Sequence, residues 1–145
     1  MIGTSWRMIC SCTSSGATWT SLDGTINGDQ LYGAAGDDSI NGLQGSDNIY
    51  GGAGNDTLSG GNGNDTLVFA SGFGSDAISG FGDAAGNQDI LEFSSAIFAN
   101  FTEVQAAMTQ VGGNVVIDPG AVGGDVLTIQ GVTLANIGAD DFRFV

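Results

Sequence analysis

The chain has 145 residues and a formal net charge of −14, because 16 acidic residues face two arginines and the sequence contains no lysine or histidine. This charge argues against binding to nucleic acid or to an anionic lipid surface, both of which need a basic face. The lack of histidine excludes Ser-His-Asp and Cys-His catalytic arrangements and an HExxH zinc site, and no apolar run is long enough to span a membrane.

Residues 1–23 predict no regular element and are interpreted as an unassigned leader or a degenerate half-coil. They lack a basic n-region and a continuous apolar stretch, so a cleavable signal peptide is not expected. Cys10 and Cys12 form a lone CxC motif. Because a zinc site needs about four ligands, this motif favours incidental thiols over a metal site.

Residues 24–68 contain five consecutive nonapeptides that share one frame. Position 1 is always glycine, position 6 always aspartate and position 8 always leucine or isoleucine. The position-6 residues are Asp29, Asp38, Asp47, Asp56 and Asp65, and the position-8 residues are Leu31, Ile40, Ile49, Leu58 and Leu67.

Each of these positions has a physical reason. Glycine permits tight turns with exposed carbonyl groups, and the last three residues of a nonapeptide can form a short strand whose aliphatic position 8 faces the core. Two nonapeptides then make one coil, and stacked coils form two parallel sheets with strands about 4.8 Å apart. Repeats n and n+2 lie above one another, which predicts that Tyr32, Tyr50 and Val68 form one outward-facing ladder.

The stacked turns predict columns of carboxylates, which repel each other unless a hard cation lies between them. Calcium takes six to eight oxygen ligands from carboxylates and carbonyls, whereas magnesium demands octahedral geometry and zinc prefers Cys or His. The alternative is a metal-free, glycine-rich solenoid in which the aspartates only shape the turns. An aspartate pair for glycoside hydrolysis is not distinguishable from these ligands by sequence.

The nonapeptides at 51–59 and 60–68 match every defined position of G-G-x-G-x-D-x-U-x, and the sequence therefore resembles the RTX (repeats-in-toxin) family. The earlier repeats depart at position 2, with Thr25, Ala34 and Leu43. The resemblance implies a calcium-bound parallel β-roll with each ion held between turns n and n+2. It pairs Asp29 with Asp47, Asp38 with Asp56, and Asp47 with Asp65, which gives about three complete sites. The full implied ligand set is Asp29, Asp38, Asp47, Asp56, Asp65 and Asp76, with the main-chain carbonyls of Gly36, Gly42, Gly45, Gly51, Gly54 and Gly60.

Residues 69–145 are interpreted as a capping and secretion region. After Val68 the frame slips, and Asp76 is the preferred partner for an upper site, with Asp83 and Asp89 as further candidates; each of the three is equally compatible with an ordinary turn aspartate. The pattern then predicts a helix over 102–110 capped by Thr102 and stopped by Gly112-Gly113. It further predicts a hairpin of strands 114–118 and 125–130, a helical turn over 133–137 and a final strand over 142–145. This tail resembles the C-terminal region of type I-secreted RTX proteins such as the serralysin-type proteases; an ordinary closing strand is the alternative.

The predicted fold class is all-β, a two-sheet parallel β-roll with a mainly-β C-terminal cap that contains a short helix. The predicted function is a calcium-binding module of a secreted protein that folds outside the cell and supports type I secretion or the stability of a larger protein. Its expected partners are calcium ions and a type I secretion apparatus, and a monomer is expected. The alternative is a rigid adhesive or surface-layer module. An enzyme is not expected, since a catalytic domain would lie upstream in a larger protein.

Overall fold

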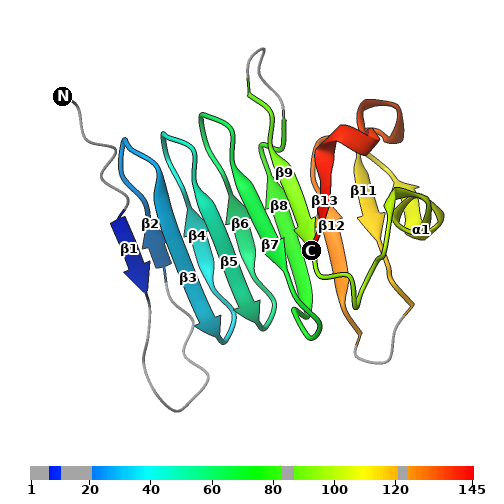
Figure 1. The fold of residues 1–145 in the computed structure, drawn as a ribbon, viewed down its shortest axis with the longest axis horizontal. Coiled ribbons are helices and arrows are strands. Elements are labelled where there is room, and N and C mark those ends of the chain that lie inside the picture. Colours follow the sequence, from blue (N-terminus) through cyan, green and yellow to red (C-terminus); the bar gives the residue numbers. More distant parts are fainter. Residues whose placement is uncertain (1–6, 11–20, 83–86, 121–123) are drawn as a thin grey trace.

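The computed structural model describes residues 7–10, 21–82, 87–120 and 124–145, and within the first of these ranges only the backbone. Two sheets of mostly parallel strands stack along the molecule, and the chain passes from one sheet to the other with each nonapeptide (Figure 1). The predicted fold class, a β-roll with a cap containing a short helix, is confirmed. No helix among the described residues is long and apolar enough to cross a membrane.

The first sheet collects the odd-numbered repeats and has the strand order β1-β3-β5-β7-β9-β13. All its neighbours pair in parallel. Its strands are β1 (Arg7–Cys10), β3 (Asp29–Ala35), β5 (Asn48–Ala53), β7 (Thr66–Phe69), β9 (Ile90–Phe93) and β13 (Phe142–Phe144).

The second sheet collects the even-numbered repeats and the cap hairpin, in the order β10-β11-β12-β8-β6-β4-β2. From β12 to β2 along this order, neighbouring strands pair in parallel. The pairs β10-β11 and β11-β12 are antiparallel. Its strands are β2 (Ser21–Asp23), β4 (Ser39–Asn41), β6 (Thr57–Ser59), β8 (Ser75–Ser79), β10 (Met108–Val111), β11 (Asn114–Ile117) and β12 (Val126–Ile129).

The pairing register follows the predicted rule that repeats n and n+2 lie above one another. Tyr32 pairs with Tyr50 and Tyr50 with Val68, so the predicted ladder is confirmed. The two tyrosine rings stack with their centroids 4.5 Å apart. Leu22 pairs with Ile40, which places residues 21–23 as a strand on the second sheet.

The narrow space between the sheets is filled by the aliphatic position 8. The five side chains at this position are buried, with at most 1% exposure. In the last coils Ile78 and Leu91 continue this ladder. Phenylalanines add to the core there, since Phe69, Phe73 and Phe93 are buried and in ring contact with one another. The aromatic cluster joins the roll to its cap, because Phe93 also contacts Phe98 and Phe142.

The helix predicted over 102–110 is shorter than expected. Helix α1 spans Phe101–Ala107, and its N-cap is Asn100, whose side chain accepts the backbone N–H of Glu103, so the predicted Thr102 cap is wrong. Residues Met108–Val111 form β10, which pairs with β11, and Gly112-Gly113 is the turn between them. Strand pairing over a two-residue glycine turn therefore wins over the local helical pattern.

The other predicted cap elements are present. Strands β11 and β12 form the antiparallel hairpin around Pro119-Gly120, and a 3-10 helix, η1, spans Leu134–Asn136. A second 3-10 helix, η2 (Ala139–Asp141), leads into β13, which pairs in parallel with β9.

Candidate metal centre

The aspartates of the odd repeats form one continuous column, in which each backbone N–H donates to the carboxylate of the next coil. Asp29 N donates to Asp47 Oδ1 at 2.7 Å, and Asp47 N donates to Asp65 Oδ1 at 2.8 Å, each across 18 residues. Asp65 N donates to Asp89 Oδ1 at 3.0 Å across 24 residues, because an insertion precedes Asp89. We call these four residues column A.

Column B is the equivalent column of the even repeats, formed by Asp38, Asp56 and Asp76. Asp38 N donates to Asp56 Oδ1 at 2.8 Å, and Asp56 N donates to Asp76 Oδ1 at 2.9 Å. The structure thus brings together all three aspartate pairs expected from the sequence, and it places Asp76 above Asp56. Asp83 lies outside the described residues.

In five of these aspartates one carboxylate oxygen accepts no hydrogen bond from the described residues. Asp47, Asp56, Asp65 and Asp76 are buried, with at most 2% exposure, and their Oδ2 atoms accept no hydrogen bond; the same holds for Oδ1 of the fully buried Asp29. A buried carboxylate oxygen without a partner is costly. At neutral pH, several such atoms in two columns form sites that a cation would neutralise.

Glycine at position 1 is required because the aspartate side chain folds back over its own turn. A Cβ added to Gly33 would lie 2.6 Å from Asp38 Oδ2, and one added to Gly42 would collide with Asp47 Oδ2. The space that a Cβ would fill is therefore the space beside the carboxylate oxygen. This explains why position 1 is glycine in all five repeats.

Main-chain carbonyls of the turns lie between successive coils. The position-1 oxygens of Gly42, Gly51 and Gly60 face the position-1 glycines of the preceding coil. The position-4 oxygens face the position-4 glycines of the following coil; they belong to Gly36, Gly45 and Gly54. All six carbonyls expected from the sequence thus lie at the contact between two coils, where the carboxylates also lie.

The electrostatics of the columns disfavour ionised carboxylates in the absence of a cation. Burial raises the pKa of Asp47 and Asp76 to about 7, and that of Asp56 and Asp65 to about 6. Backbone N–H groups from the neighbouring coil lower these pKa values, and the charges of neighbouring aspartates raise them further. A positive ion between the coils would reverse both the burial cost and the repulsion.

The donor set fits calcium. Among the described residues no group of three or more His, Cys, Asp or Glu side chains that could hold a metal converges, so carboxylates meet only in pairs. The turn carbonyls between the coils are further oxygen ligands within the same layers, and an all-oxygen set of carboxylates and carbonyls is what calcium prefers. Zinc would need Cys or His in the columns, and the columns contain neither.

Some of the participating residues were missed or undervalued in the sequence. Asp89, a lesser candidate in the sequence, is the last residue of column A. Its Oδ1 accepts Asp65 N at 3.0 Å and its Oδ2 accepts Gly82 N at 2.9 Å. Asp125 was not predicted at all and is 8% exposed. The Asp125-Val126-Leu127 alternation before a strand was the available signal, because it repeats the acidic and aliphatic spacing of the nonapeptides.

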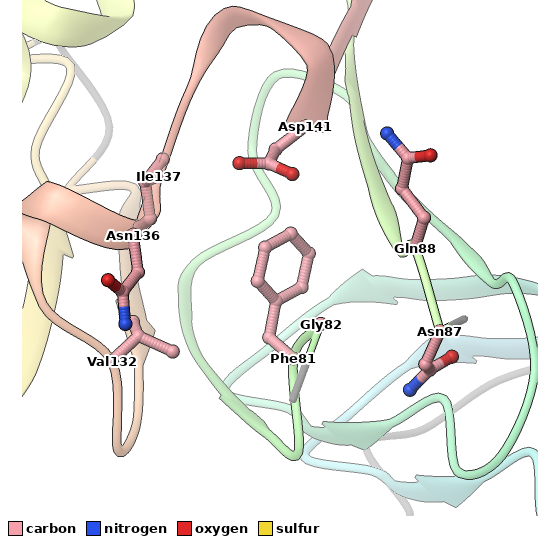
Figure 2. A pocket seen from close by; sticks show the side chains of 8 residues that line it. All are labelled: Phe81, Gly82, Asn87, Gln88, Val132, Asn136, Ile137 and Asp141. Atoms are coloured by element: carbon pink, nitrogen blue, oxygen red, sulfur yellow. The ribbon is translucent and has the colours of Figure 1, made fainter. Parts of the chain in front are cut away.

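The turn that ends at Asp89 also lines a polar pocket of about 180 Å³ between the roll and the cap. Figure 2 shows the ring of Phe81 at its centre, with Asp141 above it and Asn136 and Gln88 on opposite sides. Burial raises the pKa of Asp141, and its carboxylate accepts Gly138 N at 2.8 Å.

Two parallel sheets of nonapeptide coils, flanked by columns of buried carboxylates and interlayer carbonyls, define the class of protein as a calcium-type β-roll. Comparison with protein families gives the narrower assignment. A model of the RTX calcium-binding nonapeptide repeat, four copies in length, matches residues 23–58, 32–67 and 42–78. The repeat segment of this chain, residues 23–78, matches that family model, which describes a calcium-binding repeat.

Solved structures with similar folds include an enzyme and two repeat modules. The crystal structure of the extracellular lipase LipA from Serratia marcescens has a TM-score of 0.66 and 24% identity, over 91% of this chain and 20% of the lipase chain. The AlgE6R2 subunit from the Azotobacter vinelandii mannuronan C5-epimerase has a TM-score of 0.66 and 28% identity, over 89% of this chain and 90% of the subunit. For the AlgE6R3 subunit the TM-score is 0.63 and the identity 25%, over 89% of this chain and 80% of the subunit.

This chain therefore spans about a fifth of the lipase, and its likeness to the lipase shows the fold alone. No curated protein matches the chain in sequence.

Proposed function

We propose that this β-roll folds when it binds calcium outside the cell, as a module of a secreted protein, and that it supports the type I secretion or the stability of a larger protein. The ligands are Asp29, Asp38, Asp47, Asp56, Asp65 and Asp76, with the six turn carbonyls of Gly36, Gly42, Gly45, Gly51, Gly54 and Gly60. The observation that carries the proposal is the set of buried carboxylate oxygens in Asp29, Asp47, Asp56, Asp65 and Asp76 that accept no hydrogen bond from the part of the chain that the structure describes.

When bound, calcium supplies positive charge to carboxylates that burial has removed from water. The protein residues do the rest. The backbone N–H groups of Asp29, Asp38 and Asp47 each hold one carboxylate oxygen of the next coil, and the other oxygen of each of these carboxylates accepts no hydrogen bond from the described residues. Glycine at position 1 keeps the space beside that oxygen open, and the aliphatic core fixes the distance between the two columns.

Folding is coupled to calcium because the metal-free fold is electrostatically unfavourable. The net charge of −14 and the raised pKa values of the column carboxylates both oppose compaction at neutral pH. Ions that bind the folded state and not the unfolded chain stabilise it by mass action. The module accordingly stays unfolded at low cytosolic calcium and folds in millimolar calcium outside.

The role as a module is supported by the comparisons. The chain covers 90% of one epimerase repeat subunit, so the length of this fold corresponds to a unit found in a larger enzyme. The lipase, of which it covers 20%, is described as extracellular. We assign no catalysis to the roll itself, and we assign the C-terminal strand Phe142–Phe144 to the export region.

The test is circular dichroism of the purified chain during calcium titration, followed by addition of a chelator. We expect β-structure at millimolar calcium and a largely unfolded chain in chelator, with magnesium at equal concentration unable to replace calcium. A chain that is fully folded in chelator at pH 7.5 would show that the proposal is wrong. Secretion is tested separately, by deletion of residues 142–145 in cells that carry a type I exporter: the proposal expects the protein to remain inside the cells.

A further inference from the structure

Column B ends differently from the other layers. In the repeats every unpartnered carboxylate oxygen lies beneath a carboxylate of the next coil, as Asp47 lies beneath Asp65 and Asp56 beneath Asp76. The layer above Asp76 is the cap strand β12, and its register places Leu127 opposite Asp76. Leu127 is fully buried and apolar, so the expected second carboxylate is missing from that position.

Asp125, two residues before Leu127 in the chain, supplies a carboxylate to this layer. Its Oδ2 accepts Gly72 N at 2.8 Å and its Oδ1 accepts Gly74 N at 3.0 Å. Both glycines belong to the turn that leads directly into Asp76. The Asp125 side chain is thereby held on top of the last turn of column B, with 8% exposure.

The side chain stands where the next coil would have placed a backbone carbonyl. In the repeats the N–H of the glycine two residues before the aspartate donates to such a carbonyl: Gly36 N to Ala53 O at 2.8 Å, and Gly45 N to Asn62 O at 2.9 Å. Gly74 occupies the same position before Asp76 and donates to Asp125 instead. At this position a charged carboxylate oxygen has therefore replaced a backbone carbonyl oxygen as the acceptor.

The charges around Asp76 agree with this placement. Asp125 lies near enough to Asp76 for the two carboxylates to repel each other. Among the described side chains, Arg143 is paired with Glu92 at 3.0 Å on the first sheet. The layer next to Asp76 therefore contains a second buried acid, Asp125, and Asp76 Oδ2 has no hydrogen-bond donor among the described residues.

We propose that a calcium ion binds between Asp76 and Asp125, so that the cap hairpin provides a ligand to the last site of column B. This rests on the proposed function, because it applies the same ion chemistry to a residue outside the repeats. Calcium binding then stabilises the cap as well as the roll, because the ion lies at the start of strand β12, where this strand pairs with β8. Calcium then orders residues 126–129 as well as the repeats.

Two measurements on the folded protein test the proposal. The first is terbium-anomalous diffraction from crystals of the unchanged chain, which needs no variant. We expect a peak at about 2.3–2.6 Å from oxygens of both Asp76 and Asp125. The second is native mass spectrometry of Asp125→Asn at saturating calcium. Asp118→Asn is the matched control, since Asp118 lies exposed in the same hairpin connection and its carboxylate accepts a local N–H from Gly120.

We expect Asp125→Asn to bind one ion fewer than the unchanged chain, and Asp118→Asn to bind the full number. Hydrogen exchange over β12 is expected to accelerate in Asp125→Asn while exchange over β6 stays unchanged. A peak that touches Asp76 without Asp125, or a full ion count in folded Asp125→Asn, would overturn the inference and leave the proposed function standing. If Asp125→Asn does not fold, the diffraction experiment decides alone. A chain that binds no calcium at all would instead refute the proposed function.

Discussion

The strongest test of the columns is Asp47→Asn, because Asp47 lies between two other aspartates. Its backbone N–H donates to Asp65 and its Oδ1 accepts from Asp29, so an ion on either side would use its carboxylate. The matched control is Asp29→Asn, at the end of the same column and equally buried. An amide keeps the shape and one oxygen but removes the charge.

The expected effect has opposite signs with and without calcium. In calcium, each ion at 100 times its dissociation constant stabilises the fold by about 2.7 kcal/mol. Loss of two ions in Asp47→Asn therefore costs ~5 kcal/mol, and loss of one in Asp29→Asn costs about half as much. In chelator at pH 7, a pKa raised from 3.8 to about 7 corresponds to a penalty of at most ~4 kcal/mol for the ionised group, and we expect Asn to relieve about 2 kcal/mol of it.

The assay is urea unfolding followed by circular dichroism in saturating calcium, and refolding by a stabilising osmolyte in chelator. Asp47→Asn should be less stable than Asp29→Asn in the first condition, and more stable than the unchanged chain in the second. Equal losses from the two variants in calcium would refute the pairing of repeats n and n+2 through ions. Destabilisation in chelator would refute the electrostatic account of the columns.

Three further predictions concern the turns, the core and pH. Gly52→Ala should strongly impair folding even in calcium, because Gly52 has φ 111° and a Cβ there would collide with the carbonyl of Ala34. The control is Gly113→Ala, which should leave the urea midpoint unchanged because the space around Gly113 is open. Leu58→Ala should cost about 2–5 kcal/mol in urea unfolding, since Leu58 is fully buried, and the exposed Thr57→Ala should cost under about 0.5 kcal/mol; similar losses would contradict the assigned core face. In chelator the folded fraction should rise as the pH falls from 7.5 toward 4. The column carboxylates have a pKa of about 6 to 7 in the folded state and 3.8 in the unfolded chain, so the folded state binds protons more tightly. This contribution to stability is fully present below pH 3.8 and is lost as the pH rises through the folded pKa. A folded fraction in chelator that rises with pH, measured by circular dichroism, would contradict the raised pKa values.

The repeats could be predicted from the sequence because every level of the structure uses the same period. Glycine, aspartate and an aliphatic residue recur every nine residues, and this spacing alone fixes the turn, the column and the core. The same reasoning gave the outward ladder of Tyr32, Tyr50 and Val68. Beyond the repeats the hairpin and the final strand are still predicted correctly, but residues 108–110 were predicted as helix and belong to strand β10, because β11 lies beside them and that pairing has no local signal.

The departures at position 2 have a cost that sequence spacing does not reveal. Ala34 and Leu43 hold φ angles of 90° and 74°, in the region that glycine occupies in the later repeats. The left-handed conformation costs a residue with a side chain roughly 1–2 kcal/mol. The stacking of coils therefore imposes the turn geometry on these residues, and the earlier repeats are the less stable part of the roll. Asp125 was missed for a related reason, since its role depends on a strand from the cap and not on the repeat.

The alternation of nonapeptides between the two sheets restricts how such a chain can change in length. Every aspartate in a column pairs with one 18 residues away within the repeats, so neighbouring nonapeptides belong to opposite edges. A deletion of residues 51–59 would move each later nonapeptide to the other sheet and would bring the cap strands β9 and β12 to the wrong sides. Insertions and deletions that preserve this cap must therefore come as whole coils of two nonapeptides, which gives the gene a recombination unit twice as long as its visible repeat.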